Sequence, residues 1–478
     1  IVFNGLNGSN GDGDDGQFNN NQWVLPIDGS SNNSFFGLEP QTGINSSGDI
    51  LISGPTVDVQ SGQMPRIIID SPTTLDLQLD QITISNMGFM GGMSIHWKEA
   101  FGHFINNTWG LSPDGMSVEF GDLVGNTDNL AGNHAILGTQ KATGMVVENN
   151  VLTGASTAAV EISSGTEQVQ ILNNWIGTRI DGSVPDVPDN LDCRTFTNIN
   201  PVDPPIQAAE WFGGSGISAA GTGLNISGNV IAGMQTIHST FSTPPGALRV
   251  LGALHTIENN IIGKDVMGNT VGVCGQGIQL STQTNTTDPQ NNGHMILDNE
   301  IHQARNGYEN TTGAILWSDT SSNSFLDGGN TIRRNLVIDG PEKYFEVGPM
   351  LTTPIKIFEP AEITQINGTQ IMGGNDPSDF DQNESHCPGC IIDFYLDDGD
   401  ADEEALTHLG SVTADNNGDF TFTLDAPLPD GFGIRTTSTT TANNVIPHTW
   451  AGQTSEMSNE VYGLINDVIF IDGFENNN

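Results

Sequence analysis

The chain has 478 residues, of which 57 are acidic and only 13 are basic, so its formal net charge is −44. This acidic excess makes nucleic acid, anionic lipid and polyanionic glycans poor partners unless cations bridge the contact, and it favours divalent cations as companions. A chain of this length is too long for one ordinary globular core, but a solenoid escapes the limit because its core grows along one axis.

Residues 1–60 are rich in Asn, Gly and Ser and show no clear periodicity, and we expect an N-terminal cap or acidic segment there. Asp12 and Asp14 alternate with glycine in a way that approximates a calcium-binding loop with one residue out of step. Both are candidate Ca²⁺ ligands, and a flexible acidic turn is the alternative.

From residue 61 to about residue 350, short runs of alternating apolar and polar residues are separated by turn residues, which predicts short strands. One pattern recurs, as at Ile257–Gly263: an apolar residue, two mostly polar ones, Asn, then an apolar pair near a Gly. Repeats at intervals of a few tens of residues indicate a solenoid in which each repeat is one coil. The shared asparagines of this pattern are Asn107, Asn150, Asn174, Asn229, Asn260, Asn299 and Asn335.

The shared asparagine suits this position because Asn tolerates left-handed backbone geometry and its amide can bond to the same Asn one coil away. We therefore expect these residues to form one ladder, either inside the coil stack or along its edge. The spacing between them varies widely, so the longer intervals need extra coils or loops that project from one face. The stretch 184–205, rich in Pro and Asp, is predicted to be such a loop.

The densest mixture of acid, base and aromatic ring is His96-Trp97-Lys98-Glu99 with His103 nearby. Lys98, Glu99 and His103 are the candidate catalytic residues, with Trp97 able to stack on a sugar ring. Alternation along a strand puts His96 and Lys98 on one face, so an ordinary surface-facing pair is the competing interpretation.

A second motif supports the coil register, because Ile176–Gly182 is similar to Ile262–Gly268. With these motifs the chain resembles bacterial secreted proteins built of right-handed parallel β-helix repeats. The resemblance implies a right-handed parallel β-helix over residues 61–350. Pectin-degrading β-helix hydrolases carry Asn-Thr-Asp, Asp-Asp, Gly-His-Gly and Arg-Ile-Lys elements in that order; this chain has Asn126-Thr127-Asp128 but no Gly-His-Gly or Arg-Ile-Lys. No catalytic set is recognisable, which favours a role other than catalysis.

The pattern changes at about residue 351, where evenly spaced strands with Asp-Gly and Asn-Gly turns predict an antiparallel β-sandwich over residues 351–465. The segment is similar to the Ig-like modules that often follow such β-helices. Cys387 and Cys390 are predicted to form a local disulfide. Cys193 and Cys274 could pair across coils or remain free thiols.

One loop of this second module has oxygen-bearing side chains at alternate positions and ends in Glu, as a hard cation requires. Its candidate Ca²⁺ ligands are Asp398, Asp400, Asp402 and Glu404. An acidic turn between strands is the alternative.

Residues 466–478 resemble the Ile-Phe-x-Asp-Gly-Phe-Glu tail of many exported gammaproteobacterial proteins, and the chain begins at Ile1 rather than Met. No apolar run is long enough to span a bilayer, so we expect an exported chain without a transmembrane segment, extracellular or at the surface of a Gram-negative bacterium.

These features together favour a structural or adhesive protein that assembles head to tail into a homo-oligomer or filament. A polysaccharide lyase or glycoside hydrolase, or a glycan-binding protein without turnover, is the alternative.

Overall fold

The computed structural model describes residues 17–19, 22–26, 36–38, 50–70, 74–90, 93–118, 134–155, 158–185, 194–196, 215–233, 236–238, 246–281, 293–305, 313–318, 329–340, 343–347, 360–374, 387–400, 402–441 and 452–462. Several features singled out from the sequence lie outside these ranges, namely Asp12, Asp14, residues 126–128, Cys193 and the tail 466–478.

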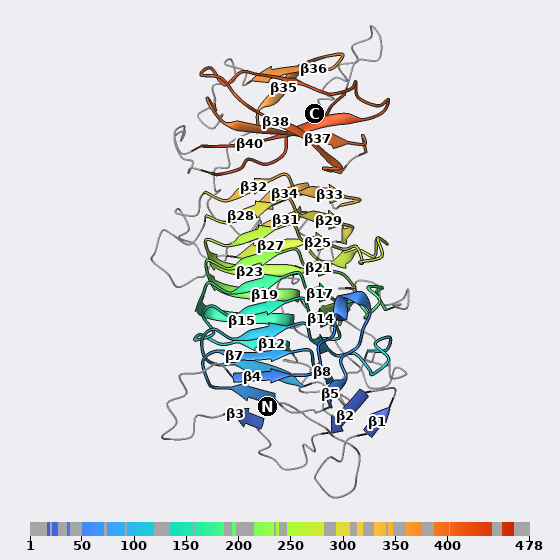
Figure 1. Ribbon diagram of the computed structural model, residues 1–478. Helices are drawn as coiled ribbons and strands as arrows, with labels where there is room; N and C mark the ends of the chain where they lie inside the picture. The colour runs from blue at the N-terminus through green and yellow to red at the C-terminus, as the bar shows by residue number, and fades with distance from the viewer. Residues whose placement is uncertain are drawn as a thin grey trace, which may run out of the picture.

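Most of the described chain winds into a stack of coils whose strands form three long sheets, with a smaller module on the last coil (Figure 1). We call the three sheets A, B and C; along the chain, each coil contributes one strand to sheet C, then one to sheet A and then one to sheet B. Every strand of these sheets pairs in parallel with the strand one coil away, except at the antiparallel pair β1 and β2. The predicted parallel β-helix is therefore confirmed.

Sheet A has nine strands: β4 (Ile50–Ser53), β7 (Ile82–Ser85), β10 (His103–Ile105), β13 (Val146–Glu148), β16 (Gln170–Leu172), β20 (Asn225–Ser227), β24 (Thr256–Glu258), β28 (Met295–Leu297) and β32 (Thr331–Arg333). Sheet B has eleven: β1 (Gln17–Asn19), β2 (Gln22–Pro26), β5 (Ile67–Asp70), β8 (Gly88–Met90), β11 (Thr108–Trp109), β14 (Val151–Leu152), β17 (Trp175–Ile176), β21 (Val230–Ile231), β25 (Ile261–Ile262), β29 (Glu300–His302) and β33 (Leu336–Ile338).

Sheet C has ten: β3 (Phe36–Leu38), β6 (Thr74–Leu77), β9 (Ser94–Trp97), β12 (His134–Gly138), β15 (Ala158–Glu167), β19 (Ser215–Thr222), β23 (Leu248–Ala253), β27 (Ile278–Ser281), β31 (Gly313–Ser318) and β34 (Lys343–Val347). Two small parallel pairs accompany them: β18 (Arg194–Phe196) with β22 (Thr236–His238), and β26 (Val273–Cys274) with β30 (Ala304–Arg305).

The segment predicted as an N-terminal cap contributes strands to all three sheets, namely β2, β3 and β4. A 3₁₀ turn, η1 (Val59–Ser61), follows β4 and lies against the corner between sheets A and B. There Asn106 Oδ1 accepts a hydrogen bond from the main-chain N–H of Val59. Val57 and Val59 pack with Val151 in a small apolar cluster separate from the main core.

The predicted asparagine ladder is confirmed, and it is internal. All seven shared asparagines are at most 1% exposed, at the corner between sheets A and B. In a typical member, the Asn229 Nδ2 donates to Asn260 Oδ1 at 2.9 Å and to the Ile171 carbonyl at 2.8 Å. Its Oδ1 accepts the main-chain N–H and the Nδ2 of Asn174, each at 2.9 Å. The same bonds link the ladder from Asn107 to Asn335.

The left-handed backbone belongs to a different residue from the one predicted. It is the position before each shared asparagine that has positive φ, for example 57° at Asn149 and 56° at Asn259. The left-handed residue turns the chain from sheet A into sheet B, and the buried asparagine after it then faces the core. The prediction that the shared asparagine itself adopts this conformation is wrong.

The glycine that closes each repeat is required by both conformation and space. Gly177 has φ of 83°, and a Cβ there would collide with the carbonyl oxygen of Ala232 in the next coil. Gly263 has φ of 82° and meets the carbonyl of His302 in the same way. A side chain at either site would push adjacent coils apart.

A second ladder lies at the corner between sheets C and A, where the sequence shows no repeat. The Nδ1 of His255 accepts the main-chain N–H of Leu224 at 3.2 Å, and the Nδ1 of His294 accepts that of His255 at 3.3 Å. Asn330 Oδ1 accepts a hydrogen bond from the main-chain N–H of His294 at 3.0 Å. An imidazole nitrogen and an amide oxygen therefore accept equivalent main-chain hydrogen bonds in successive coils. The two rings stack at 4.8 Å.

The uneven spacing of the asparagines comes from loops rather than from extra coils. Asn174 and Asn229 are 55 residues apart, yet β16 and β20 pair directly, as do β17 and β21. The additional residues of this interval lie between β17 of sheet B and β19 of sheet C. Residues 184–205, predicted to be a projecting loop, fall in this interval, and residues 186–193 and 197–205 lie outside the described ranges.

After the last coil the chain forms two antiparallel sheets with the predicted Ig-like sandwich arrangement. One contains β35 (Glu362–Asn367), β36 (Gln370–Gly374) and β39 (Phe420–Thr423); the other contains β38 (Thr407–Thr413), β37 (Ile391–Asp397), β40 (Gly433–Thr439) and β41 (Val461–Tyr462). Their apolar core includes Ile392, Phe394 and Phe420 and encloses the disulfide that joins Cys387 to Cys390. Cys274 is also disulfide-bonded, so it is not a free thiol.

Replacing Asn229 with Ala leaves the buried N–H groups and carbonyl that it serves without partners. Each unpaired group costs about 1–3 kcal/mol, so we expect the free energy of unfolding to fall by at least about 3 kcal/mol. Chemical denaturation followed by circular dichroism measures the change. Gln170→Ala, at an exposed position of sheet A, should shift the midpoint little, and an equal loss in both variants would contradict the role of the ladder.

The histidine ladder predicts a loss of stability in acid. Burial lowers the pKa of His255 to about 4 and that of His294 well below its usual value, with repulsion between the two rings adding to the latter. The unfolded chain takes up these protons below about pH 6.5. Stability from this source is therefore present above pH 6.5 and falls as the pH decreases toward 4.

Thermal melts between about pH 7.5 and about pH 5 measure this dependence. The double variant His255→Asn, His294→Asn keeps an acceptor at each position, as Asn330 does naturally, but cannot titrate. We expect its melting temperature to depend less on pH than that of the wild type, and identical slopes would refute the assignment.

Candidate functional site

The outward face of sheet C carries ionisable side chains at four of six matched positions in successive coils, the other two being Leu137 and Ser218. The pairing register aligns Asp76 with His96, then Leu137 with Glu161, and finally Ser218 with Arg249. From Asp76 to Arg249 the row crosses five strand spacings, about 24 Å at about 4.8 Å each. It brings together residues far apart in the sequence, on rigid neighbouring strands.

Asp76 is the centre of the first cluster in this row. Its Oδ2 lies 2.6 Å from the Lys98 Nζ, and its Oδ1 lies 3.4 Å from the His96 Nδ1 without hydrogen-bond geometry. The carboxylate is only 7% exposed, so one buried oxygen retains capacity to accept a bond. Burial lowers the pKa of His96, and the carboxylate of Asp76 opposes that shift.

Beside this cluster is an open groove of about 500 Å³, lined by Gln78, Lys98, Glu99, Thr139, Gln140 and Lys141. Lys141 Nζ lies 2.9 Å from Glu99 Oε1 across neighbouring coils, and the lysine side chain is 71% exposed. Amides, a hydroxyl, a carboxylate and two ammonium groups therefore face one solvent-accessible depression.

The second cluster lies further along the same face. His134 Nδ1 is 2.9 Å from Glu161 Oε2. Burial lowers the pKa of the Arg249 guanidinium, and the Glu161 carboxylate opposes the shift. The Nε of Arg249 is buried and has no hydrogen-bond partner among the described residues. At one end of the row, Asp76 Oδ1 can accept a further hydrogen bond, and at the other end Arg249 Nε can donate one.

The structure brings together some of the residues singled out from sequence and separates others. Lys98 and Glu99 line the groove, but His103 is on β10 in sheet A. Trp97 is fully buried in the β-helix core, so the expectation that it stacks on a sugar is wrong. The alternation that puts Lys98 outside necessarily turns its neighbour inward.

Sequence reasoning missed the partners of these residues, which are Asp76, Lys141, His134, Glu161 and Arg249. Each pair spans different coils, and Lys141 is 42 residues from Glu99. Only a coil register accurate to one residue could have found them, and loops of variable length hide that register in this part of the chain.

In the predicted calcium loop, aspartate side chains accept hydrogen bonds from main-chain N–H groups of the same loop. Asp398 Oδ1 accepts the N–H of Asp400 at 3.3 Å, and Asp400 Oδ1 accepts that of Asp402 at 2.8 Å. Within the described ranges, no group of three or more His, Cys, Asp or Glu side chains is placed to hold a metal ion. Calcium binding by this loop stays a prediction.

Glu404, the fourth predicted ligand, faces the last coil of the β-helix. Its Oε1 accepts the N–H of Gly340 at 3.2 Å, and the residue is 2% exposed. Burial raises the pKa of Glu404 to about 7, with the carboxylates of Asp398, Asp400 and Asp339 adding to the shift. This side chain therefore belongs to the contact between the two parts of the chain.

Comparison of the sequence with known protein families found no match, and neither did comparison with curated proteins. In the part of the chain that the structure describes, no helix has the length and apolar character needed to cross a membrane.

The first cluster makes a specific electrostatic prediction. The Asp76 carboxylate raises the pKa of His96 and the Lys98 ammonium lowers it. We therefore expect Asp76→Asn to lower this pKa further and Lys98→Met to raise it. NMR titration of the His96 ring measures both shifts, with the His103 ring as internal control. Shifts of the same sign in both variants would show that the cluster is not coupled as described.

Proposed function

We propose that this chain is a secreted or cell-surface adhesive protein whose β-helix holds an extended glycan along the outward face of sheet C. The observation that carries the proposal is the groove of Lys98, Glu99 and Lys141 beside the aligned charged row. A carboxylate accepts from sugar hydroxyls, whereas ammonium and amide groups donate to hydroxyl and carboxylate oxygens.

The shape of the site favours a polymer over a small ligand. The groove is open, and the charged row continues along the stack for about 24 Å, about five strand spacings. A chain of sugars lying parallel to the solenoid axis can contact several coils at once. Several weak contacts made together give a higher affinity than any one of them alone. The net charge of −44 disfavours both nucleic acid and polyanionic glycans, so the proposed ligand is a neutral or weakly charged polysaccharide.

The redox state of the cysteines supports an exported protein. Cys387, Cys390 and Cys274 are all in disulfides, which persist in oxidising compartments and are rare in the cytosol. Together with the tail resemblance, this supports a place outside the cell or on the surface of a Gram-negative bacterium. A stiff stack of coils suits adhesion, because it holds a binding face at a fixed distance from its base.

Glycan binding predicts that removing the groove cations weakens affinity without unfolding the coil. Loss of one charge-assisted hydrogen bond costs about 1.5–3 kcal/mol, so we expect Lys98→Ala and Lys141→Ala each to weaken binding by about tenfold or more. Glycan-array screening followed by calorimetry on the best ligand, with neutral and uronate-containing chains, gives the affinities.

Lys264→Ala is the matched control, because Lys264 makes a similar 3.0 Å ion pair with Glu300 on sheet B. It should leave binding unchanged. If no glycan binds the wild type, or if the control loses as much affinity, the proposal fails. Appearance of new reducing or unsaturated ends that Lys98→Ala or Glu99→Ala abolishes would instead show an enzyme.

A further inference from the structure

The sandwich module completes the hydrogen bonding of the last β-helix coil. Five main-chain N–H groups of that coil point away from the preceding coil, and each donates a hydrogen bond to an oxygen atom of the module. The pairs are Ile332 with Thr454 Oγ1 (2.9 Å), Arg334 with Tyr395 Oη (2.9 Å), Val337 with the Ala405 carbonyl (3.1 Å), Gly340 with Glu404 Oε1 (3.2 Å) and Tyr344 with Glu403 Oε2 (3.4 Å).

The module also closes the apolar core of the solenoid. Tyr395, Ala405 and Met457 belong to the same buried cluster as the β-helix side chains. The Tyr395 ring lies 5.7 Å from that of Tyr344 on β34. Without these side chains the last layer of the stack would face water.

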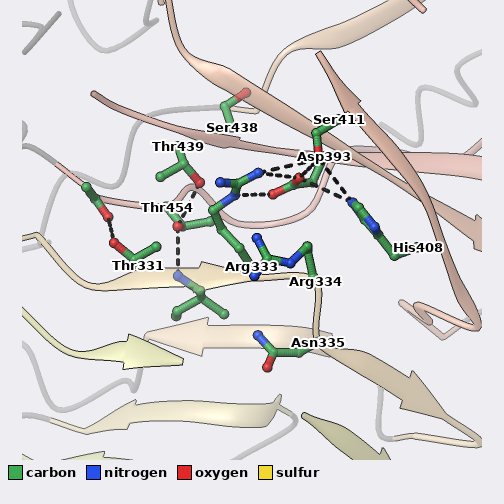
Figure 2. Close-up of polar contacts among 12 residues, drawn as sticks. Thr331, Arg333, Arg334, Asn335, Asp393, His408, Ser411, Ser438, Thr439 and Thr454 are labelled. Carbon is green, nitrogen blue, oxygen red and sulfur yellow. Dashed lines mark hydrogen bonds and ion pairs between the residues drawn. The ribbon is translucent and has the colours of Figure 1, made fainter. Parts of the chain in front are cut away.

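An ion pair at one side of the contact joins the two parts directly. Arg333 on β32 donates two hydrogen bonds, of 2.6 and 2.7 Å, to the carboxylate of Asp393 on β37 (Figure 2). His408 and Ser411 approach the same carboxylate, which is fully buried. Although burial alone would raise the pKa of Asp393, these partners hold it at about 2.

The opposite end of the stack has the complementary edge in sheets A and C. Sheets A and C begin with β4 and β3, and no described strand precedes either of them. The described strands of sheets A and C pair in parallel and in register, whereas sheet B begins with the antiparallel pair β1 and β2. A first coil could therefore continue the sheets beyond a last coil, if nothing else occupied that edge.

We propose that the sandwich module is a stop that keeps the solenoid from adding a second copy of itself. While docked, it uses the N–H groups and the apolar layer that the first coil of another molecule would need. When it is displaced, the last coil accepts the first coil of a second copy, and head-to-tail assembly follows. This inference is independent of glycan binding.

The test reverses the charge of the ion pair in the full-length chain. Arg333→Glu sets a carboxylate against Asp393, and Asp393→Lys sets an ammonium group against Arg333. Because Asp393 is fully buried and Arg333 is not, the Arg333 variant carries the test if the other fails to fold. The double variant Arg333→Glu, Asp393→Lys restores opposite charges.

Arg334→Glu is the matched control. Arg334 makes an ion pair of 2.7 Å with Asp298, which belongs to the previous coil rather than to the module. Its removal perturbs the same turn and changes the net charge equally, but leaves the Arg333 pair with Asp393 in place.

Hydrogen exchange and light scattering together decide the outcome. In the single reversed variants we expect the amides of Ile332, Arg334 and Val337 to exchange at least about tenfold faster. The molar mass should rise with protein concentration above the 50.7 kDa of one chain. About 0.15 M salt or more is needed to screen repulsion between acidic copies.

The swapped double variant and the Arg334→Glu control should remain monomeric with protected amides. Fast exchange without a rise in mass would overturn the proposal, because the freed edge would then recruit no partner. A rise of equal size in the control would also overturn it, as would amides that stay protected in both reversed variants.

Discussion

The hydrogen bonds of the buried asparagine ladder are the interactions on which the coil stack depends. The sharp corner between sheets A and B leaves main-chain groups inside an apolar core, where unpaired groups are costly. Each asparagine bonds to the coils on both sides, as Asn229 does to Asn174 in the preceding coil and to Asn260 in the following coil. The buried N–H groups of one coil are therefore hydrogen-bonded only if the next coil carries an acceptor at the same position. This requirement favours the same residue in every repeat.

The same requirement explains how the stack ends. The final coil has no following coil to accept hydrogen bonds from its main-chain N–H groups, so it needs acceptors from another source. Here they come from the sandwich module, through hydroxyl, carbonyl and carboxylate oxygens such as those of Thr454, Ala405 and Glu404. Because Tyr395 and Met457 also enter the β-helix core, the module is an integral end of the solenoid as well as a separate β-sandwich.

Sequence could predict the scaffold because one chemical group repeats at one corner, and identical residues are visible as a pattern. It could not locate the left-handed turn residue, since Asn149 and Asn150 are adjacent and chemically the same. It also missed the ladder of His255, His294 and Asn330. There, ring nitrogen and amide oxygen accept equivalent bonds, but the residues share no sequence signature.

The candidate site lies where the ladder constrains the chain least. The A–B corner is fixed by asparagines, whereas the B–C corner accommodates insertions as different as those behind the spacings of 24 and 55 residues. Sheet C follows that free corner and has the longest strands, with ten residues in β15 and eight in β19. Outward positions there can vary without disturbing a buried hydrogen bond. A solenoid that acquires a binding face would therefore do so on this sheet, where Asp76, Lys98 and Glu161 lie.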